Sequence, residues 1–472
     1  LSRLAYDAAG IYFDWSKTHL DAGLIGAFLD LADRQGFIQA RDALFGGEIV
    51  NVTEQRRADH VAERGSGEAA AVELAAARRS RMRSLVDAVE AGAFGEITGV
   101  LHIGIGGSVL GPALLVDALG RADARLQVSF LSNIDPQAFD AAVEPLDPAT
   151  TLIVAASKTF TTAETLANLD AATDWLREGG ADDPFGRVIA VTAAPEAALE
   201  AGIDESRILQ FSEGVGGRYS LWSAVSLSAA LALGWNDFEE LLEGAAEMDR
   251  HFRFAEPADN VPLLAAFADQ LYTQKLGCES RAAFPYDERL WMLVPYLQQL
   301  EMESNGKSVT TDGRPIGRPG APVVWGGVGT DAQHAVFQLL HQGGAIIPVE
   351  FVTVSEDESD LPDHHRQLLL NAFAQGAALM RGRQSDDPHR NNPGNRPSTT
   401  ILLDRLDART LGALIAFYEH RTFANAVLLG INPFDQFGVE LGKALARELS
   451  ENADEGASLD ASTRVLIEKA GL

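Results

Sequence analysis

Short apolar stretches rich in β-branched residues alternate with longer helical patterns in two parts of this chain. Such alternation is typical of parallel sheets, because each strand needs a crossover helix before the next parallel strand can begin. We therefore expect a first group of strands near Val100–Ile103, Leu126–Leu131, Thr151–Ala156, Val188–Val191 and Ile208–Phe211, and a second near Arg281–Phe284, Val323–Trp325, Ile346–Val354 and Thr400–Leu403. The pattern predicts an α/β protein with two doubly wound parallel sheets.

The length supports two domains, since 472 residues exceed what one compact core organises. We expect a helical N-terminal arm over residues 1–80 that packs on the larger domain, a first α/β domain over 81–235, a second over 236–450, and a C-terminal helical tail over 451–472. That tail contains an amphipathic helix near Ala461–Ala470. The two α/β halves do not visibly repeat in sequence.

Composition excludes several classes of partner. A net charge of −29 argues against nucleic acid, whose phosphates need clustered Lys and Arg. An anionic substrate would need a locally positive or amide-rich pocket.

The longest apolar candidate for a membrane span, Leu221–Trp235, is short and interrupted by serines, so no membrane partner is expected. Cys278 is the single cysteine, which suits a reducing compartment, and the start carries no secretory pattern, so we expect a cytoplasmic protein. Because residue 1 is Leu, a trimmed start stays open.

A glycine-rich loop, His102-Ile-Gly-Ile-Gly-Gly-Ser108, lies between an expected strand and a helix that opens near Val109. Its glycines, including Gly107, would let the backbone approach an anion at a helix N-terminus. The dinucleotide fingerprint fails, because Val109 stands where glycine or alanine is required. Phosphate binding and a simple tight turn explain this loop about equally well.

A second loop, Ser157-Lys-Thr-Phe-Thr-Thr162, also follows an apolar strand and precedes a helix. Four hydroxyls and the Lys158 ammonium at a helix start form an oxyanion cradle. Helix capping explains one or two of these residues, but not the whole group. Two such loops at strand ends of one sheet predict a phosphate site.

Glu303 follows a helical pattern over Trp291–Leu300 and precedes the stop Asn305–Gly306. At that end the helix dipole disfavours negative charge, which suits a base near neutral pH. From spacing alone, a routine surface pair of Lys307 with Glu301 or Glu303 is favoured over that role.

His334 lies in the first turn of a helix that we expect Thr330 or Asp331 to cap. His341 is seven residues on, and a metal pair would want four-residue spacing and another ligand, so no metal is expected. For His334, catalytic and structural interpretations remain close.

Two cations stand in helical or turn contexts. Arg218 follows a glycine pair just before an apolar helix that we expect Ser220 to cap, a place where the helix dipole favours acids. This misfit favours an anion as the partner of Arg218, and a plain surface arginine stays open as the alternative. Lys443, in Gly438–Lys443, superficially resembles a phosphate loop, but Ala444 replaces the required Ser or Thr and nucleotide binding is rejected. Spacing alone favours a surface role for Lys443.

Together these segments resemble the glucose-6-phosphate isomerase family in order and spacing. The resemblance rests on seven stretches: Gly104–Pro112, Ser157–Thr165, Gly216–Val225, Gln298–Lys307, Gly329–Gly343, Gly394–Ser398 and Phe434–Lys443. The chain departs from the family at Ala58–His60 and at Ser226 and Ser228.

The resemblance implies two sugar-isomerase domains and interconversion of glucose 6-phosphate and fructose 6-phosphate in glycolysis and gluconeogenesis, without a cofactor. It implies a homodimer in which His334 enters the partner's active site. His334 with Lys443 would open the sugar ring, Glu303 would move a proton between C2 and C1 through a cis-enediolate, and Arg218 would stabilise the anion. Phosphate and sugar would bind to Gly107, Ser108, Ser157, the Lys158 backbone amide, Thr159, Thr162, Gln299 and Gln436.

Two alternatives remain at this stage. A phosphosugar-sensing regulator would keep the phosphate cradle but lack the base, and would usually carry a DNA-binding module. An isomerase that also accepts mannose 6-phosphate is the closer rival, and sequence does not decide between the substrates.

Overall fold

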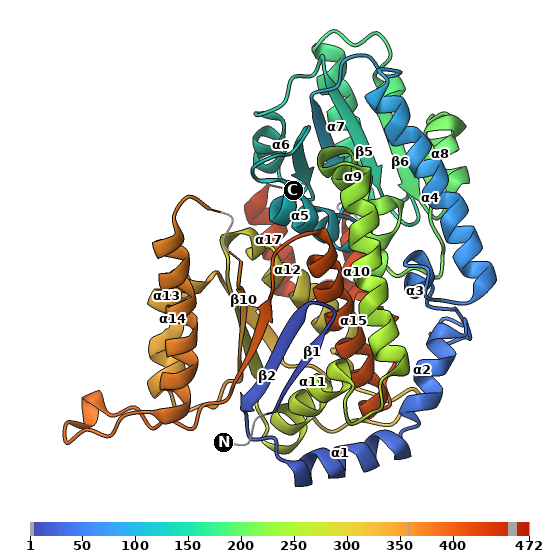
Figure 1. Cartoon of the computed structure of the whole chain (residues 1–472). Coiled ribbons are helices and arrows are strands. Elements are labelled where there is room, and N and C mark those ends of the chain that lie inside the picture. Colours follow the sequence, from blue (N-terminus) through green and yellow to red (C-terminus); the bar gives the residue numbers. More distant parts are fainter. Residues whose placement is uncertain (1–3, 357–358, 452–459, 472) are drawn as a thin grey trace. The chain divides into compact units, whose positions relative to one another are not determined.

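The computed structural model describes residues 4–356, 359–451 and 460–471. The chain divides into two compact units, the first ending at Pro433 and the second beginning at Phe434. The first unit holds two sheets, each covered by helices on both faces (Figure 1). The doubly wound α/β prediction is thereby confirmed.

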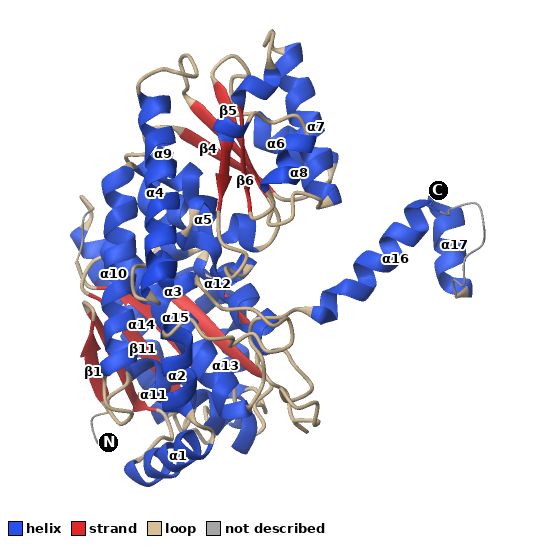
Figure 2. Cartoon of the chain, turned by 90° about the vertical axis from the view of Figure 1, so that its right-hand side faces the viewer, coloured by secondary structure: helices blue, strands red, loops and turns tan. Residues whose placement is uncertain are grey.

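The first sheet has the strand order β4-β3-β5-β6-β7 and is parallel throughout. Its strands are β3 (Gly99–Ile103), β4 (Gln127–Leu131), β5 (Thr151–Ala156), β6 (Val188–Thr192) and β7 (Ile208–Gln210). One face packs against α6 (Pro136–Val143), α7 (Ala163–Glu178) and α8 (Pro195–Glu200), and the other against α4 (Ala69–Glu90), α5 (Gly107–Gly120) and α9 (Leu227–Leu233) (Figure 2). All five expected strands are present.

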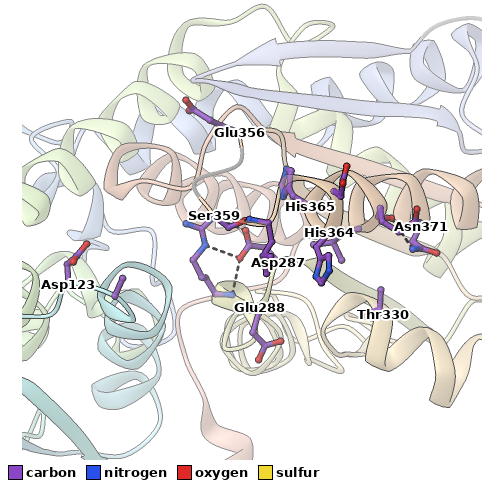
Figure 3. Close-up of a pocket in the computed structure, with 15 residues that line it drawn as sticks. Asp123, Asp287, Glu288, Thr330, Glu356, Ser359, His364, His365 and Asn371 are labelled. Atoms are coloured by element: carbon purple, nitrogen blue, oxygen red, sulfur yellow. Dashed lines mark hydrogen bonds and ion pairs between the residues drawn. The ribbon is translucent and has the colours of Figure 1, made fainter.

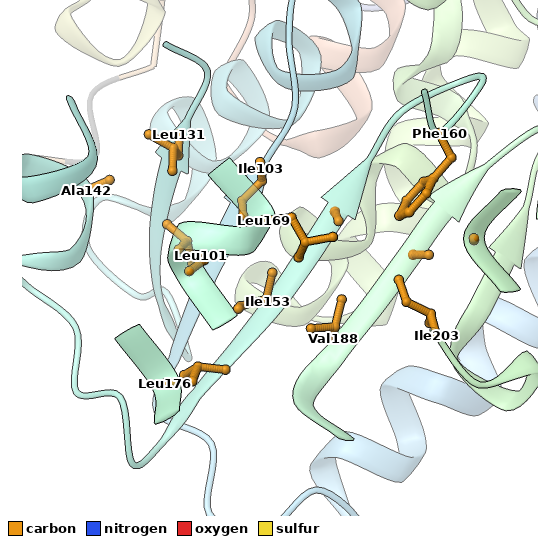
Figure 4. Close-up of a cluster of buried hydrophobic side chains, with 14 of the residues drawn as sticks. Leu101, Ile103, Leu131, Ala142, Ile153, Phe160, Leu169, Leu176, Val188 and Ile203 are labelled. Carbon is orange, nitrogen blue, oxygen red and sulfur yellow. The ribbon is translucent and has the colours of Figure 1, made fainter. Parts of the chain in front are cut away.

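Apolar side chains from neighbouring strands form the core beneath α7. Ile153 and Val188 lie against Leu169 and Leu176 of the helix, and all four side chains are almost completely buried (Figure 4). Strands buried on both faces read as continuous apolar runs, which is why their positions are visible in the sequence.

The second sheet has the order β1-β2-β11-β10-β8-β9. Its strands are β1 (Ala5–Ala8), β2 (Ile11–Lys17), β8 (Ser280–Tyr286), β9 (Val323–Gly326), β10 (Val349–Val354) and β11 (Ser398–Leu403). The helices α13 (Gly329–Gln342) and α14 (Pro362–Arg381) cover one face, while α10 (Trp235–Phe254), α11 (Val261–Gln270) and α15 (Ala408–Leu429) lie on the other side (Figure 1). The four strands expected here are confirmed.

The expectation of a wholly helical N-terminus is wrong for residues 5–17. These residues form a hairpin whose turn, Ala9–Gly10, has positive φ at both positions, and β2 pairs antiparallel with β11. The second sheet is therefore mixed. Helices follow only later, as α1 (Ala22–Arg34), α2 (Phe37–Phe45) and α3 (His60–Glu63). The expected domain boundaries stay predictions.

The remaining helices connect or end the chain. After β8 come α12 (Leu293–Leu297) and a π-helical turn over Gln298–Glu303, and a second π-turn, Leu271–Lys275, follows α11. The second unit contains α16 (Glu440–Glu451) and α17 (Ala461–Ala470), and α17 has the expected bounds. Residues 452–459 of the expected tail lie outside the described part. Among the described helices, none has the length and apolar character needed to cross a membrane.

Candidate active site

The two loops singled out in the sequence lie at the reversal point of the first sheet. The chain leaves β3 for the edge strand β4 and then returns to β5 on the other side of β3. The carboxyl ends of β3 and β5 therefore flank the crevice where open α/β sheets bind ligands. The loops are adjacent, since a side chain added at Gly104 would lie 3.1 Å from the Ala156 carbonyl oxygen.

The glycine loop needs its glycines for close approach to two other segments. Gly106 has a φ of 59°, and an added Cβ would lie 2.8 Å from the Gln299 side-chain nitrogen. At Gly107 an added Cβ would lie 2.1 Å from the Gly217 carbonyl oxygen and 2.5 Å from the Arg218 nitrogen. Glycine here therefore does more than form a turn: it brings the loop against the segments that carry Gln299 and Arg218.

Hydroxyl groups of the second loop lie close to one another. Ser157 Oγ is 3.2 Å from Thr162 Oγ1 and accepts a bond from the Phe160 backbone N–H, while Thr161 donates to Thr159 Oγ1 over 2.8 Å. Although Thr162 precedes α7, its side chain makes no capping bond in the described structure. Helix capping therefore does not account for this hydroxyl.

Phe160 anchors this loop from below. It has a φ of 53°, a conformation that a bulky L-residue rarely adopts, and its ring enters the core of the first sheet (Figure 4). Such strain persists only where surrounding packing over-determines it, and strained residues cluster at functional sites. The buried Phe160 ring thus fixes the backbone conformation of the loop that carries the hydroxyl groups.

The Lys158 ammonium does not extend freely from the loop. Its Nζ donates to the carbonyl oxygens of Glu213 (2.8 Å) and Val215 (3.1 Å). Burial, followed by repulsion from Arg56, lowers the pKa of Lys158. This geometry leaves the backbone N–H as the group that an anion would use, as the family resemblance implies.

Arg218 and Glu303 form an ion pair next to the glycine loop. The distance from Arg218 Nη1 to Glu303 Oε1 is 3.5 Å; the Arg218 side chain is 2% exposed and that of Glu303 is 23% exposed. Glu303 ends the π-turn that also carries Gln299. The Lys307 ammonium donates to the Glu303 main-chain carbonyl. Glu301 pairs instead with buried Arg281, so the expected alternative of a surface pair does not apply to Glu301.

Sequence reasoning missed the residues that orient Arg218. Its Nε–H donates to Ser304 Oγ over 2.6 Å, and one Nη donates to the Pro433 carbonyl. The guanidinium lies over the Tyr219 ring, and the Tyr219 hydroxyl is 2.9 Å from Ser304 Oγ. The only available sequence signal for Ser304 was a polar residue immediately before the helix stop.

Several cap predictions need correction. The helix with His334 begins at Gly329 after Val328, so Thr330 and Asp331 lie inside its first turn and do not cap it. Ser220 lies inside a 3₁₀ turn, Gly217–Trp222, and does not begin a long helix. Both errors reflect tight 3₁₀ or glycine-led helix starts that side-chain type does not reveal.

Three further expected site residues lie on later elements of the chain. His334 is exposed on α13, and Gln436 and Lys443 belong to the second unit, with Lys443 on α16. The structure assembles Gly107, Gln299, Arg218 and Glu303 beside the loops of Ser108 and Ser157.

A cavity of about 960 Å³ lies at the equivalent reversal point of the second sheet, beyond β8 and β10 (Figure 3). Its wall includes the carboxylates of Asp287, Glu288, Glu356 and Asp363, and Arg289 is paired with Asp287. An acidic lining disfavours a phosphate. Within the described residues, no group of three or more His, Cys, Asp or Glu is arranged to hold a metal ion.

The fold and the two loops at its reversal point are typical of an α/β protein that binds a phosphorylated ligand. The family model described as phosphoglucose isomerase matches residues 14–467. The chain belongs to the phosphoglucose isomerase family.

Relatives of known name agree over nearly the whole chain. The glucose-6-phosphate isomerase of Rhizorhabdus wittichii is 62% identical over 472 residues, covering 100% of this chain and 94% of the relative. That of Zymomonas mobilis is 56% identical over 468 residues, covering 99% and 92%. The resemblance inferred from the motifs is confirmed.

Solved structures agree on the fold. The crystal structure of a glucose-6-phosphate isomerase from Chlamydia trachomatis has a TM-score of 0.91 and 30% identity, covering 98% of this chain and 92% of that one. A hypothetical protein from Thermus thermophilus has a TM-score of 0.70 and 24% identity, covering 91% and 99%, and bears on the fold alone.

Proposed function

We propose that this chain interconverts glucose 6-phosphate and fructose 6-phosphate as an aldose–ketose isomerase, a reaction of glycolysis and gluconeogenesis. Family membership supports the reaction, and the named relatives are glucose-6-phosphate isomerases. The observation that carries the proposal is the Arg218–Glu303 pair set against the glycine loop, because it combines a base, a cation and a phosphate-binding backbone in one place.

The substrate phosphate binds between the two loops. The hydroxyls of Ser108, Ser157, Thr159 and Thr162 and the backbone amides of Gly107 and Lys158 donate to its oxygens. The positive end of α5 adds to this field, which offsets the repulsion expected from a net charge of −29. Gln299 and Gln436 line the sugar.

Ring opening precedes isomerisation. His334, with Lys443 as its partner, moves a proton between O5 and O1, so that the cyclic sugar becomes the open-chain aldehyde. Since His334 is exposed within one chain, it is available to act in the site of a second copy.

Proton transfer then takes place at C1 and C2. The Glu303 carboxylate removes the C2 proton, the electron pair forms the C1–C2 double bond, and the carbonyl oxygen becomes the enediolate oxygen. Protonated Glu303 returns the proton to C1, the proton of the O2 hydroxyl passes to O1 as the C2=O bond forms, and the ketose results. Arg218, charged and nearly buried, stabilises the negative oxygen, which is usually the largest electrostatic contribution to such a barrier.

The enzyme is a cytoplasmic homodimer. Helix α13, which bears the exposed His334, also exposes Leu339, and helix α14 exposes Leu370 and Phe373; these three residues are 50%, 45% and 43% accessible. Grouped apolar side chains of this kind mark interaction surfaces. Cys278 is free and buried, as expected for a protein of a reducing compartment.

The test is conversion of fructose 6-phosphate, read by a coupled dehydrogenase, with mannose 6-phosphate as the parallel substrate. Glu303→Gln should lower kcat by about 10³-fold or more, since the variant loses its base while keeping its shape. The matched control is Glu178→Gln, an exposed residue near the end of α7, which should leave turnover unchanged. Near-normal turnover by Glu303→Gln would sink the assignment of the base. A folded wild type that binds the phosphosugar without turnover would instead be a phosphosugar sensor.

A further inference from the structure

A proline interrupts the helix that carries Ser108. Pro112 lies inside α5, four residues after Ser108. In a regular helix the Ser108 carbonyl would accept from the N–H of residue 112, but proline has no N–H and its ring crowds that carbonyl. The first turn of α5, where the phosphate is to bind, therefore lacks one of its normal stabilising bonds.

His102 supplies the missing donor from the end of β3. Its Nε2 is 2.7 Å from the Ser108 carbonyl oxygen, and its Nδ1 is 2.8 Å from Ser228 Oγ on α9. The ring is completely buried and packs beside Phe130. Because a carbonyl only accepts, Nε2 must carry the proton, and Nδ1 then accepts from the Ser228 hydroxyl.

Burial keeps this arrangement neutral. Loss of solvation lowers the pKa of His102 to about 4, partly opposed by the bond to Ser108. Near neutral pH the imidazole therefore has one N–H, and Ser228 selects which nitrogen holds it. A neutral ring also adds no charge beneath the phosphate, so its effect is one of orientation.

We propose that His102, oriented by Ser228, is a positioning residue for the phosphate site: it holds the Ser108 carbonyl that Pro112 leaves without its helical partner. The first-turn amides and the Ser108 hydroxyl thereby keep the direction needed to bind phosphate. The inference rests on the proposed function, in which the loop from Gly104 to Ser108 binds the substrate phosphate.

The first experiment compares wild type with His102→Ala. Calorimetry measures the affinity of each protein for inorganic phosphate, and kinetics measure how strongly phosphate inhibits fructose 6-phosphate turnover. We expect phosphate affinity to fall and KM to rise by about tenfold each, because about 1.4 kcal/mol of binding is tenfold in affinity. The change in kcat should be less than about threefold, since the base and Arg218 are untouched.

The decisive variant is the double mutant His102→Ala/Pro112→Ala. Alanine at position 112 provides the N–H that the Ser108 carbonyl lacks, so phosphate affinity should return toward that of the wild type. A merely structural histidine would give no such rescue. His102→Gln keeps a side-chain N–H donor, so its affinity for phosphate should be within about threefold of the wild-type affinity. This variant replaces His102→Ala in the comparison if the alanine variant does not fold.

The outcomes separate the two proposals. Wild type that binds no phosphate and turns over no substrate contradicts the proposed function. Wild type that does both, with a folded His102→Ala of unchanged KM and phosphate affinity, overturns only the positioning role. So does a double mutant that binds phosphate no better than His102→Ala.

Discussion

Arg218 owes its orientation to neighbours that the sequence places far from it. A buried guanidinium is stable only when its donors are satisfied. Here Ser304, Pro433 and Glu303 each meet a different nitrogen, and Tyr219 lies beneath the plane. Ser304 is covalently next to Glu303, so one hydroxyl ties the cation to the helix end that carries the proposed base.

The first residue-scale prediction concerns that hydroxyl. Ser304→Ala should lower kcat by about tenfold with little change in KM, because Arg218 acts mainly on the charge that develops in the transition state. Steady-state kinetics measure both constants. Ser223→Ala, another buried serine whose hydroxyl bonds to a backbone carbonyl, is the control and should keep wild-type kinetics.

A double-mutant cycle with Arg218→Lys sharpens this prediction. Lysine lacks the planar fork, so Ser304→Ala should cost little more in that background. If the two losses simply multiply, Ser304 does not act through Arg218.

His102 also predicts a pH dependence of stability. Its pKa is lowered from 6.5 to about 4 by burial, so below pH 6.5 the unfolded chain binds a proton that the folded chain does not. Its contribution is therefore present above pH 6.5 and is lost as the pH falls toward 4. Urea denaturation at pH 7 and pH 5 measures how much the free energy of unfolding falls between the two pH values. That fall should be smaller by about 2 kcal/mol in His102→Gln than in the wild type. Equal losses in both proteins would contradict this.

At the scale of elements, the π-turn Gln298–Glu303 presents Gln299 and Glu303 to the candidate site and Glu301 to the interior. Gln299 touches the glycine loop and Glu303 meets Arg218, whereas Glu301 turns inward to Arg281. Arg281 also pairs with Asp269, which in turn bonds to Arg421 of α15. π-helical turns are uncommon and often occur at functional sites. Here the buried ion pairs fasten the turn to its surroundings.

Removing Arg281 should therefore be costly. Arg281→Met leaves Glu301 and Asp269 in the interior with less compensation, and breaking a buried pair costs about 3–5 kcal/mol. Urea denaturation measures the loss. The control is Arg177→Met, whose exposed partner is Asp174 and whose loss should be below about 1 kcal/mol. A similar effect for both variants would show that the buried network does not stabilise the fold.

The N-terminal hairpin shows why one element escaped the sequence reading. Ile11, Phe13 and Trp15 alternate with less buried residues along β2, which is a strand pattern. Phe13 stacks on Trp15 and meets Phe417 of α15. The strand is short, and its partner β11 lies nearly four hundred residues away. The local pattern of residues 1–80 is dominated by the helices that follow the hairpin, so a helical arm was expected for the whole segment.

On the scale of the whole first unit, the two sheets share a topology. The strand order β4-β3-β5-β6 in the first sheet corresponds to β9-β8-β10-β11 in the second, so the chain visits the strands in the same sequence. Each sheet then continues on the same side, with β7 next to β6 in the first sheet and the N-terminal β2 next to β11 in the second. Equivalent reversal points nevertheless differ chemically. The first carries glycines and hydroxyls, whereas the second is acidic, so only the first suits a phosphate.

The proposed dimer with shared active sites gives a prediction for the whole assembly. Glu303→Gln and His334→Ala should each be inactive as homodimers. After the two are unfolded and refolded together, heterodimers contain one intact site, and random pairing restores about a quarter of wild-type activity. The coupled assay measures recovery, and each variant refolded alone is the control. No recovery in a mixture that forms heterodimers would show that His334 acts within its own chain.

The sequence alone determined the strands of the first sheet, the four parallel strands of the second, the two loops at strand ends and the family, because buried strands and glycine-rich turns are local patterns. It also singled out Arg218 and Glu303, although their spacing alone did not establish that they meet. Only the tertiary structure decided that Ser304 orients Arg218, that Glu301 faces the core, and that His102 replaces the bond lost at Pro112. Those relations depend on hydrogen-bond geometry between separate elements, which is set by how the elements pack.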